Sequence, residues 1–259
     1  TSETDGTYSY IIKGEENATT VDTSKAATIE VIYTAYDKAG NKGEVQRQVI
    51  VATEVPSISY IAEEGAINAD GWAKEDFYVT INVQDNSGHG IKEFRVCTTT
   101  SGSCEPSKGS TITGTEATRL ISTEGNGNQI CVQATDNYGQ TSPTMCSDTY
   151  KLDKTTPTAG TISIEGTRGD NDWYISDLRI DPVNGSDGLS GHLSTTVDIT
   201  SITENTSGQK VIVTTIDRAG NEYWFIFSLW DIALQNHMMK GWGQKKVFQL
   251  PMLFTLLIS

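Results

Sequence analysis

The sequence predicts an all-β protein built from tandem β-sandwich modules, and three observations support this prediction. The chain has 259 residues, more than one common sandwich needs. Its apolar residues fall in short runs rich in Val, Ile and Tyr, separated by turns that contain Gly, which is typical of strands. The same strand and turn also recur three times along the chain. We therefore expect two or three modules and no long helix.

The recurring unit is an alternating strand that ends in an Asp-x-x-Gly turn, and it spans residues 31–41, 130–140 and 211–221. Small or apolar side chains at alternate positions give each strand one side that faces a core. An Asp side chain can cap a type I turn, and a Gly three residues later can adopt a positive φ. We therefore interpret the following residues as turn formers rather than catalysts: Asp37, Gly40, Asp136, Gly139, Asp217 and Gly220.

A longer correspondence predicts the module boundaries. Pro56 and Pro157 lie 101 residues apart, and so do Trp72 and Trp173. We predict the C-terminal part of a truncated module at 1–55, a module with two disulfides at 56–153, a module at 154–229 and a hydrophobic, non-modular tail at 230–259. The two tryptophans have alternative interpretations, because rings at the same module position either pack in a core or form a platform for stacking a ligand.

The C-terminal tail departs from the rest of the chain in composition. Residues 224–259 hold three of the five Trp and three of the four Met. The closing apolar run, 247–259, is shorter than the roughly 20 residues that span a bilayer, so we expect no clear membrane span. An interfacial anchor and a lost coding frame both explain this composition. The second explanation is favoured, because the composition changes and the repeat pattern ends at the same point of the sequence.

Charge and residue usage argue against several functions. A formal net charge of −14 disfavours binding to nucleic acid. Only three His are present, and no motif of a hydrolase, a P-loop or a zinc site is found, so we expect no enzyme activity. We also expect no cofactor. The alternative is Ca²⁺ at a module junction, where loops of neighbouring modules meet. This ion takes six to eight oxygen ligands, and the acidic clusters at 85–88 and 170–172 each supply fewer than that alone.

All four cysteines lie in the predicted second module, and their spacing predicts two local disulfides. Cys97 and Cys104 flank a run that is typical of a hairpin tip, while Cys131 and Cys146 lie equally far from the turn at Asp136. A metal site is the competing use of these residues, but the tight Cys pairs of zinc motifs are missing. Disulfides would also support an exported location.

Two groups of residues resemble a known family. The segment from Asp22 to Asn41 is similar to the C-terminal half of bacterial immunoglobulin-like surface repeats. The segment 152–157, the pair Trp173 and Tyr174, and the turn 217–221 resemble a related repeat of large exported proteins from Gram-positive bacteria. The resemblance covers about residues 1 to 226, and it implies tandem immunoglobulin-like sandwiches of which the first lacks its opening strands.

The resemblance and the composition together predict a non-catalytic stalk, spacer or adhesive repeat region. We expect an extracellular or cell-surface location, with the signal peptide and the anchor outside these residues. The expected partners are neighbouring modules and a host or cell-wall glycan or protein. The alternative is a set of carbohydrate- or ligand-binding accessory modules of a large secreted enzyme whose catalytic domain lies elsewhere.

Overall fold

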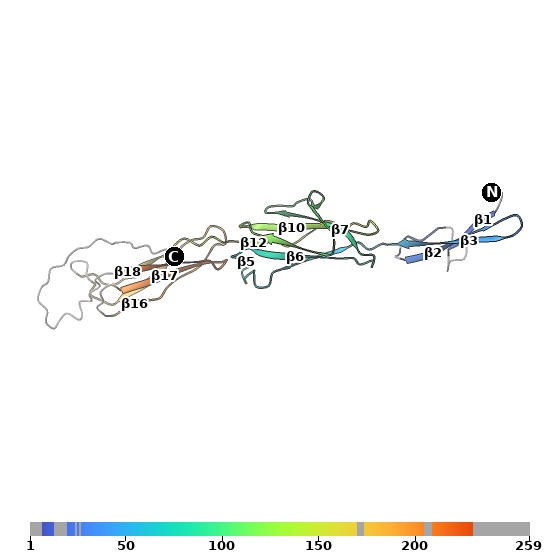
Figure 1. Ribbon diagram of the computed structural model, residues 1–259. Coiled ribbons are helices and arrows are strands. Elements are labelled where there is room, and N and C mark those ends of the chain that lie inside the picture. The colour runs from blue at the N-terminus through green and yellow to red at the C-terminus, as the bar shows by residue number, and fades with distance from the viewer. Residues whose placement is uncertain are drawn as a thin grey trace. The chain divides into compact units, whose positions relative to one another are not determined.

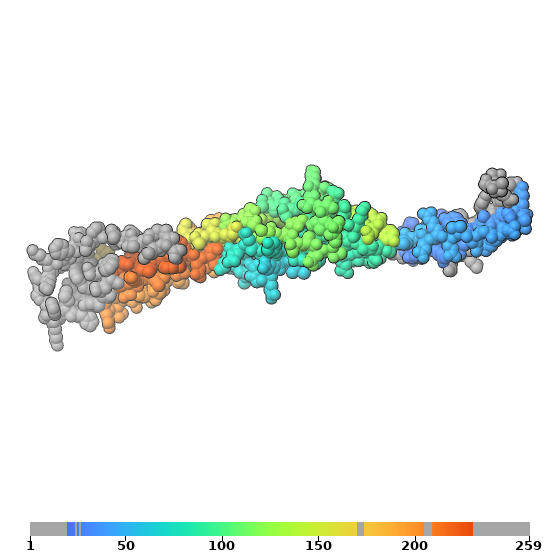
Figure 2. Space-filling view, in the orientation of Figure 1, coloured from blue at the N-terminus to red at the C-terminus, as the bar shows by residue number. Residues whose placement is uncertain are grey.

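The computed structural model describes residues 7–12, 20–23, 25, 27–169, 174–204 and 209–229. Within these residues the chain forms strands and a single 3-10 turn, η1 (Pro106–Lys108) (Figure 1). The predicted all-β fold class is therefore confirmed. Figure 2 shows the surface that each segment contributes, from β2 and β3 in blue to β17 and β18 in orange.

The chain divides into two compact units. The first unit comprises Thr1–Ile61, Val79–Arg119 and Gln129–Asp148. The second unit comprises Ala62–Tyr78, Leu120–Asn128 and Thr149–Ser259. The module boundaries near Pro56 and Lys154, the tandem repeat and the truncation of the first module remain predictions.

The N-terminal sheet is a three-stranded antiparallel meander in the first unit. It has the order β1 (Thr7–Ile12), β2 (Ala27–Tyr36) and β3 (Lys42–Val51). Strands β2 and β3 pair along their full length from Ala27 opposite Val51 to Tyr36 opposite Lys42. The Asp37 turn joins them, so the first copy of the recurring unit forms a hairpin.

Two sheets follow, and both have an alternating burial pattern. On β6, Val79, Ile81 and Val83 are buried while the residues between them are more exposed, because successive side chains of a strand point to opposite faces. The first sheet has the order β5-β12-β10-β7-β8, with β11 also paired to β10, and the second has the order β4-β6-β9. Their strands are β4 (Ser57–Ala62), β5 (Trp72–Ala73), β6 (Phe77–Gln84), β7 (Ile91–Thr99), β8 (Ser110–Ile112), β9 (Glu116–Ile121), β10 (Gly125–Asp136), β11 (Met145–Cys146) and β12 (Tyr150–Leu152).

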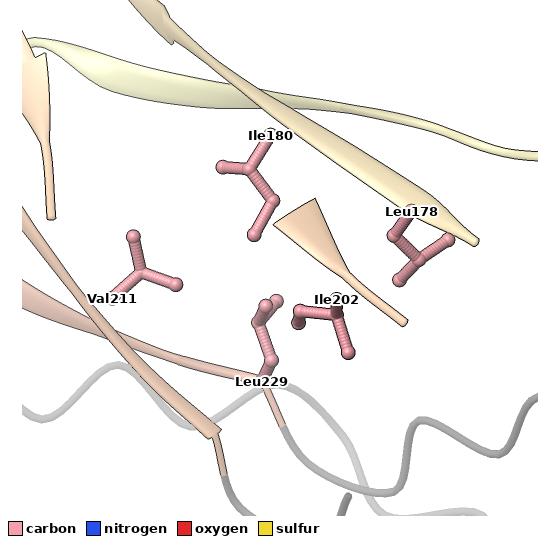
Figure 3. Packing of buried hydrophobic residues seen from close by; sticks show 5 residues of the cluster. All are labelled: Leu178, Ile180, Ile202, Val211 and Leu229. Atoms are coloured by element: carbon pink, nitrogen blue, oxygen red, sulfur yellow. The ribbon is translucent and has the colours of Figure 1, made fainter. Parts of the chain in front are cut away.

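The C-terminal part of the second unit is built from two three-stranded sheets with a shared core. The orders are β13-β14-β16 and β15-β17-β18. Buried side chains from both sheets point toward one another in Figure 3, and these are Leu178, Ile180, Ile202, Val211 and Leu229. The strands are β13 (Thr161–Glu165), β14 (Leu178–Val183), β15 (His192–Val197), β16 (Ser201–Ile202), β17 (Gln209–Asp217) and β18 (Glu222–Leu229).

Strand β18 pairs with β17 along its whole length, from Glu222 opposite Ile216 to Leu229 opposite Gln209. The last described strand thus includes Leu229. The predicted tail at 230–259 lies outside the described residues. None of the described segments forms a helix with the length and apolar character needed to cross a membrane.

Candidate metal centre

The three Asp-x-x-Gly turns share one hydrogen-bonding pattern. In each, the first Asp accepts backbone N–H bonds through Oδ1, and the Gly adopts a positive φ of 86° at Gly40, 86° at Gly139 and 91° at Gly220. A positive φ is accessible to Gly because it has no Cβ. The turn residues therefore have a local structural role in all three copies.

The third turn also belongs to a cluster of carboxylates. Asp153, Asp187 and Asp217 each place a carboxylate oxygen within 4.8 Å of the other two, and all three residues lie in the second unit. Asp153 directly follows β12, Asp187 lies in the loop between β14 and β15, and Asp217 ends β17. The fold thus brings together residues that are far apart in sequence.

Asp153 and Asp217 are fully buried. Asp153 Oδ2 accepts a hydrogen bond from Ser190 N at 2.9 Å, and its Oδ1 accepts one from Thr155 N at 3.1 Å. Asp217 Oδ2 accepts a bond from Asn221 Nδ2 at 2.9 Å, and the same amide also donates to the carbonyl oxygen of Asp153 at 2.9 Å. The Asn221 side chain therefore fixes two of the three acidic residues relative to each other.

Asp187 is half-buried and is held by its own loop. Its Oδ1 accepts hydrogen bonds from Gly191 N at 2.7 Å, Leu189 N at 3.0 Å and Ser190 Oγ at 3.2 Å. Burial by itself would raise the pKa of Asp187, but these hydrogen bonds outweigh it and lower the pKa below its usual value. The carboxylate is therefore ionised at neutral pH.

Within the part of the chain that the structure describes, no ion pair balances the charge of this cluster. Among the described residues, no Lys, Arg or His forms an ion pair with any of the three carboxylates. The neighbouring Lys154 instead pairs with Asp76 at 3.0 Å. Buried like charges are costly without a counter-charge. A set of oxygen donors without His or Cys fits a hard divalent cation such as Ca²⁺.

The acidic loop predicted at 85–88 forms a turn. Asp85 accepts bonds from Ser87 N at 2.9 Å, Ser87 Oγ at 2.7 Å and Gly90 N at 2.6 Å, and also from His89 N. Burial alone would raise the pKa of Asp85, but the bonds from Ser87, Gly90 and His89 lower it to about 2. The other predicted acidic cluster, at 170–172, lies outside the described residues.

The four cysteines form two disulfides, Cys97 with Cys104 and Cys131 with Cys146. Cys131 lies directly opposite Cys146 in the pairing of β10 with β11. The bridge is therefore a cross-strand one. Cys131 is also fully buried, although it alternates with the core residues Ile130 and Val132 and so lies on the other face of β10.

Trp72 is buried at 7% exposure on β5, and Lys151 Nζ lies 5.6 Å from the centre of its ring. This burial favours the packing interpretation over a platform for stacking a ligand. Trp173 lies outside the described residues.

Sequence reasoning identified Asp217 only as a turn former and did not single out Asp153 or Asp187 as possible ligands. One signal was available for Asp153. It lies four residues before Pro157, whereas Ala52 lies four residues before the corresponding Pro56. The second of these linkers thus carries a carboxylate at a position where the first has the apolar Ala52.

Comparisons with known proteins found several similar solved structures. No family model and no curated protein matches the chain. A solved structure of an adhesin, described as Ca²⁺-stabilized and as helping an Antarctic bacterium bind ice, is 17% identical with a TM-score of 0.37. That match covers 80% of this chain and 56% of the adhesin chain, so our chain spans about half of that structure.

Two further solved structures are similar to this chain. The fibronectin(III)-like modules of Clostridium thermocellum CbhA are 11% identical with a TM-score of 0.32, and the match covers 72% of this chain and 100% of theirs. The Bacteroides ovatus SGBP-B protein, solved with a mixed-linkage heptasaccharide, is 13% identical with a TM-score of 0.16, and the match covers 84% and 56%.

Proposed function

We propose that this chain is a non-catalytic spacer region of an exported bacterial protein, in which β-sandwich modules are joined by linkers that hydrogen bonds hold in place. The observation that carries this proposal is the anchoring of the linker at 153–160. At its start, Asp153 N donates to Ala73 O at 3.0 Å and Lys154 N donates to Glu124 Oε1 at 2.6 Å. At its end, Thr158 N donates to Ser186 O at 2.7 Å and Gly160 N donates to Thr215 Oγ1 at 2.9 Å.

A linker with this many backbone contacts differs from a flexible tether, whose backbone is solvated. The two disulfides support the exported location, because such bonds persist in oxidising environments. A Gram-positive source and attachment to a cell surface belong to the same proposal.

We further propose that Asp153, Asp187 and Asp217 bind Ca²⁺ and lock the linker at this point. The ion would take one oxygen or more from each carboxylate, with carbonyl oxygens or water completing its shell of six to eight ligands. Because Asp153 belongs to the linker while Asp187 and Asp217 belong to the following loops, a bound ion would hold the linker in one conformation.

The test is the rotational diffusion of the full chain, measured by ¹⁵N relaxation with Ca²⁺ and with a chelator. We expect residues 62–78 and residues 174–229 to share one correlation time in Ca²⁺ and to separate when Ca²⁺ is removed. Separate correlation times in both conditions would contradict the spacer proposal. One shared time in both conditions would contradict only the role of the ion.

A second candidate function is glycan binding as an accessory module of a secreted enzyme. An exposed aromatic ring favours it, because Trp224 on β18 is 47% exposed and such rings stack on apolar faces of ligands. A glycan array probed with the wild type, Trp224→Ala and the matched control Tyr78→Ala tests it. Binding that Trp224→Ala abolishes and the control retains would favour this function.

A further inference from the structure

Three of the four cysteines lie in one row across three neighbouring strands of the first unit. In the pairing of β10 with β11, Cys131 is directly opposite Cys146. In the pairing of β10 with β7, the same Cys131 is directly opposite Cys97. Directly opposed residues of antiparallel strands place their side chains on the same face of the sheet. The row therefore runs from Cys97 through Cys131 to Cys146.

This row allows a disulfide that the resting protein does not contain. Opposed residues in antiparallel strands have Cα atoms about 4.5 or 5.5 Å apart, which lies within the usual range of about 4.4 to 6.8 Å for disulfides. Cys97 and Cys131 thus meet the distance requirement without movement of the backbone. Cys97 is instead bonded to Cys104, which belongs to the segment between β7 and η1 and has a Cα 6.0 Å from that of Cys97.

The four cysteines differ in exposure. Cys131 is fully buried, Cys97 and Cys104 are partly exposed, and Cys146 is exposed. A small thiol can therefore reach Cys97, Cys104 or Cys146, but it reaches Cys131 only through one of its neighbours. When a thiol enters at Cys104, which is flanked by the exposed residues 101–103, the exchange can release a thiol at the exposed Cys146.

We propose that Cys97, Cys131 and Cys146 form a thiol–disulfide relay that exposes a free Cys146 thiol when a low-molecular-weight thiol attacks Cys104. The incoming thiolate forms a mixed disulfide with Cys104 Sγ and breaks the bond to Cys97, which leaves as a thiolate. The Cys97 thiolate then attacks Cys131 Sγ, forms the Cys97–Cys131 bond and breaks the bond to Cys146. One thiolate enters and one leaves, so charge and electrons balance.

The order of the three residues favours the second step. Displacement at sulfur is in line, and Cys97 and Cys146 lie on opposite sides of Cys131 because β7 and β11 flank β10. The segment around Cys146 also stays attached after the exchange. Ser147 N donates to Ile130 O at 2.8 Å, and Ser142 N donates to Ala134 O at 2.8 Å. The released thiol is thus held at the surface, where it can form a disulfide with a second molecule.

The relay is tested with two variants that remove the same bridge. Cys104→Ser leaves Cys97 without its partner, and Cys97→Ser, the matched control, leaves Cys104 without its partner. Both proteins are alkylated under native, non-reducing conditions and mapped by mass spectrometry. In Cys104→Ser we expect the alkyl label on Cys146 and a Cys97–Cys131 disulfide. In Cys97→Ser we expect the label on Cys104 and an intact Cys131–Cys146 bridge.

A label on Cys97 in Cys104→Ser, with the Cys131–Cys146 bridge intact, would overturn the proposal. The wild-type protein provides a second measurement that does not depend on how the variants fold. After treatment with glutathione at a one-to-one ratio, we expect the glutathione adduct on Cys104 and the alkyl label on Cys146. An adduct on Cys104 together with a label on Cys97 would contradict the relay.

Discussion

Two linker regions of the molecule share one hydrogen-bonding framework but differ in charge. In the second unit, Asn221 Nδ2 donates to Asp153 O, and Arg218 N donates to Gly191 O at 2.9 Å. In the first unit, Gln140 Nε2 donates to Ala52 O, and Asn137 N donates to Gly90 O at 3.0 Å. The framework therefore forms in the first unit with Ala52 where the second unit has Asp153.

The comparison separates the acidic residues that shape turns and loops in both regions from the one acidic residue, Asp153, that is present in the second region alone. Asp136 and Asp217 both cap a turn, and Asp85 and Asp187 both order a loop. The Asp153 side chain has no counterpart at Ala52. The first region also leaves Asp136 Oδ2 buried without a hydrogen-bond donor among the described residues, whereas Asn221 donates to Asp217 Oδ2. Gln140 takes the place of Asn221 in the first region, but its side chain is one methylene longer and donates no hydrogen bond to Asp136 Oδ2.

The largest expected effect comes from making the second linker resemble the first. Asp153→Asn keeps the size of the side chain and removes its charge. We expect the stabilisation by Ca²⁺ to be lost, which amounts to about 2.7 kcal/mol when the ion is at 100 times its Kd. Calorimetry of the wild type and the variant, each with Ca²⁺ and with chelator, measures this. The control Asp136→Asn should retain the Ca²⁺-dependent shift, and an unchanged shift in Asp153→Asn would refute the site.

Substitution of the glycines in the two turns should have a smaller effect on stability than Asp153→Asn, and the effect should be the same in both turns. Gly139→Ala and Gly220→Ala each place a Cβ at a positive φ, although neither Cβ would meet another atom within 4 Å. The cost is therefore conformational and should be about 1 to 2 kcal/mol in each turn. Chemical denaturation followed by tryptophan fluorescence measures it. A clearly larger loss in one variant would mean that the two frameworks differ in more than charge.

The reverse exchange should create a weaker version of the site. Ala52→Asp places a carboxylate at the position that corresponds to Asp153, and the added charge should attract a divalent cation. At a Ca²⁺ concentration of a few times the Kd, the expected stabilisation is about 1 kcal/mol. Differential scanning calorimetry of this variant against Ala52→Asn separates charge from size. Equal thermal midpoints of the two variants in Ca²⁺ would show that a carboxylate at this position does not create a cation site in the first region.

The smallest expected effect is on the pH dependence of folding stability in acid. The pKa of Asp85 is about 2 in the folded protein, below its value of about 3.9 in an unfolded chain. Its ionised form therefore stabilises the fold at neutral pH, and this contribution is lost as the pH falls from about 4 to about 2. Asp187, whose pKa is also lowered, should behave in the same direction. Asp85→Asn should flatten the pH dependence of stability in this range, and identical curves would exclude the effect.

Local patterns explain how much of the structure the sequence predicts. Alternation with a period of two and the Asp-x-x-Gly spacing predict the strands β2, β10 and β17 and their turns, because both features depend on near neighbours. The cysteine spacings likewise place Cys131 opposite Cys146 across one turn. Asp187 gives no such signal, because its approach to Asp153 and Asp217 depends on how separate strands pack. The burial of Cys131 on the outer face of β10 has the same origin.

The pairing of β12 gives the linker a mechanical property. Strand β12 leads directly into Asp153, and it pairs in parallel with β5 through Lys151 opposite Trp72 and Leu152 opposite Ala73. Tension on the following segment acts along the axis of β12 and loads these hydrogen bonds in shear. Bonds loaded in this way must break together, whereas bonds in a peeled hairpin break one after another. The last strand before the linker is therefore arranged to resist extension.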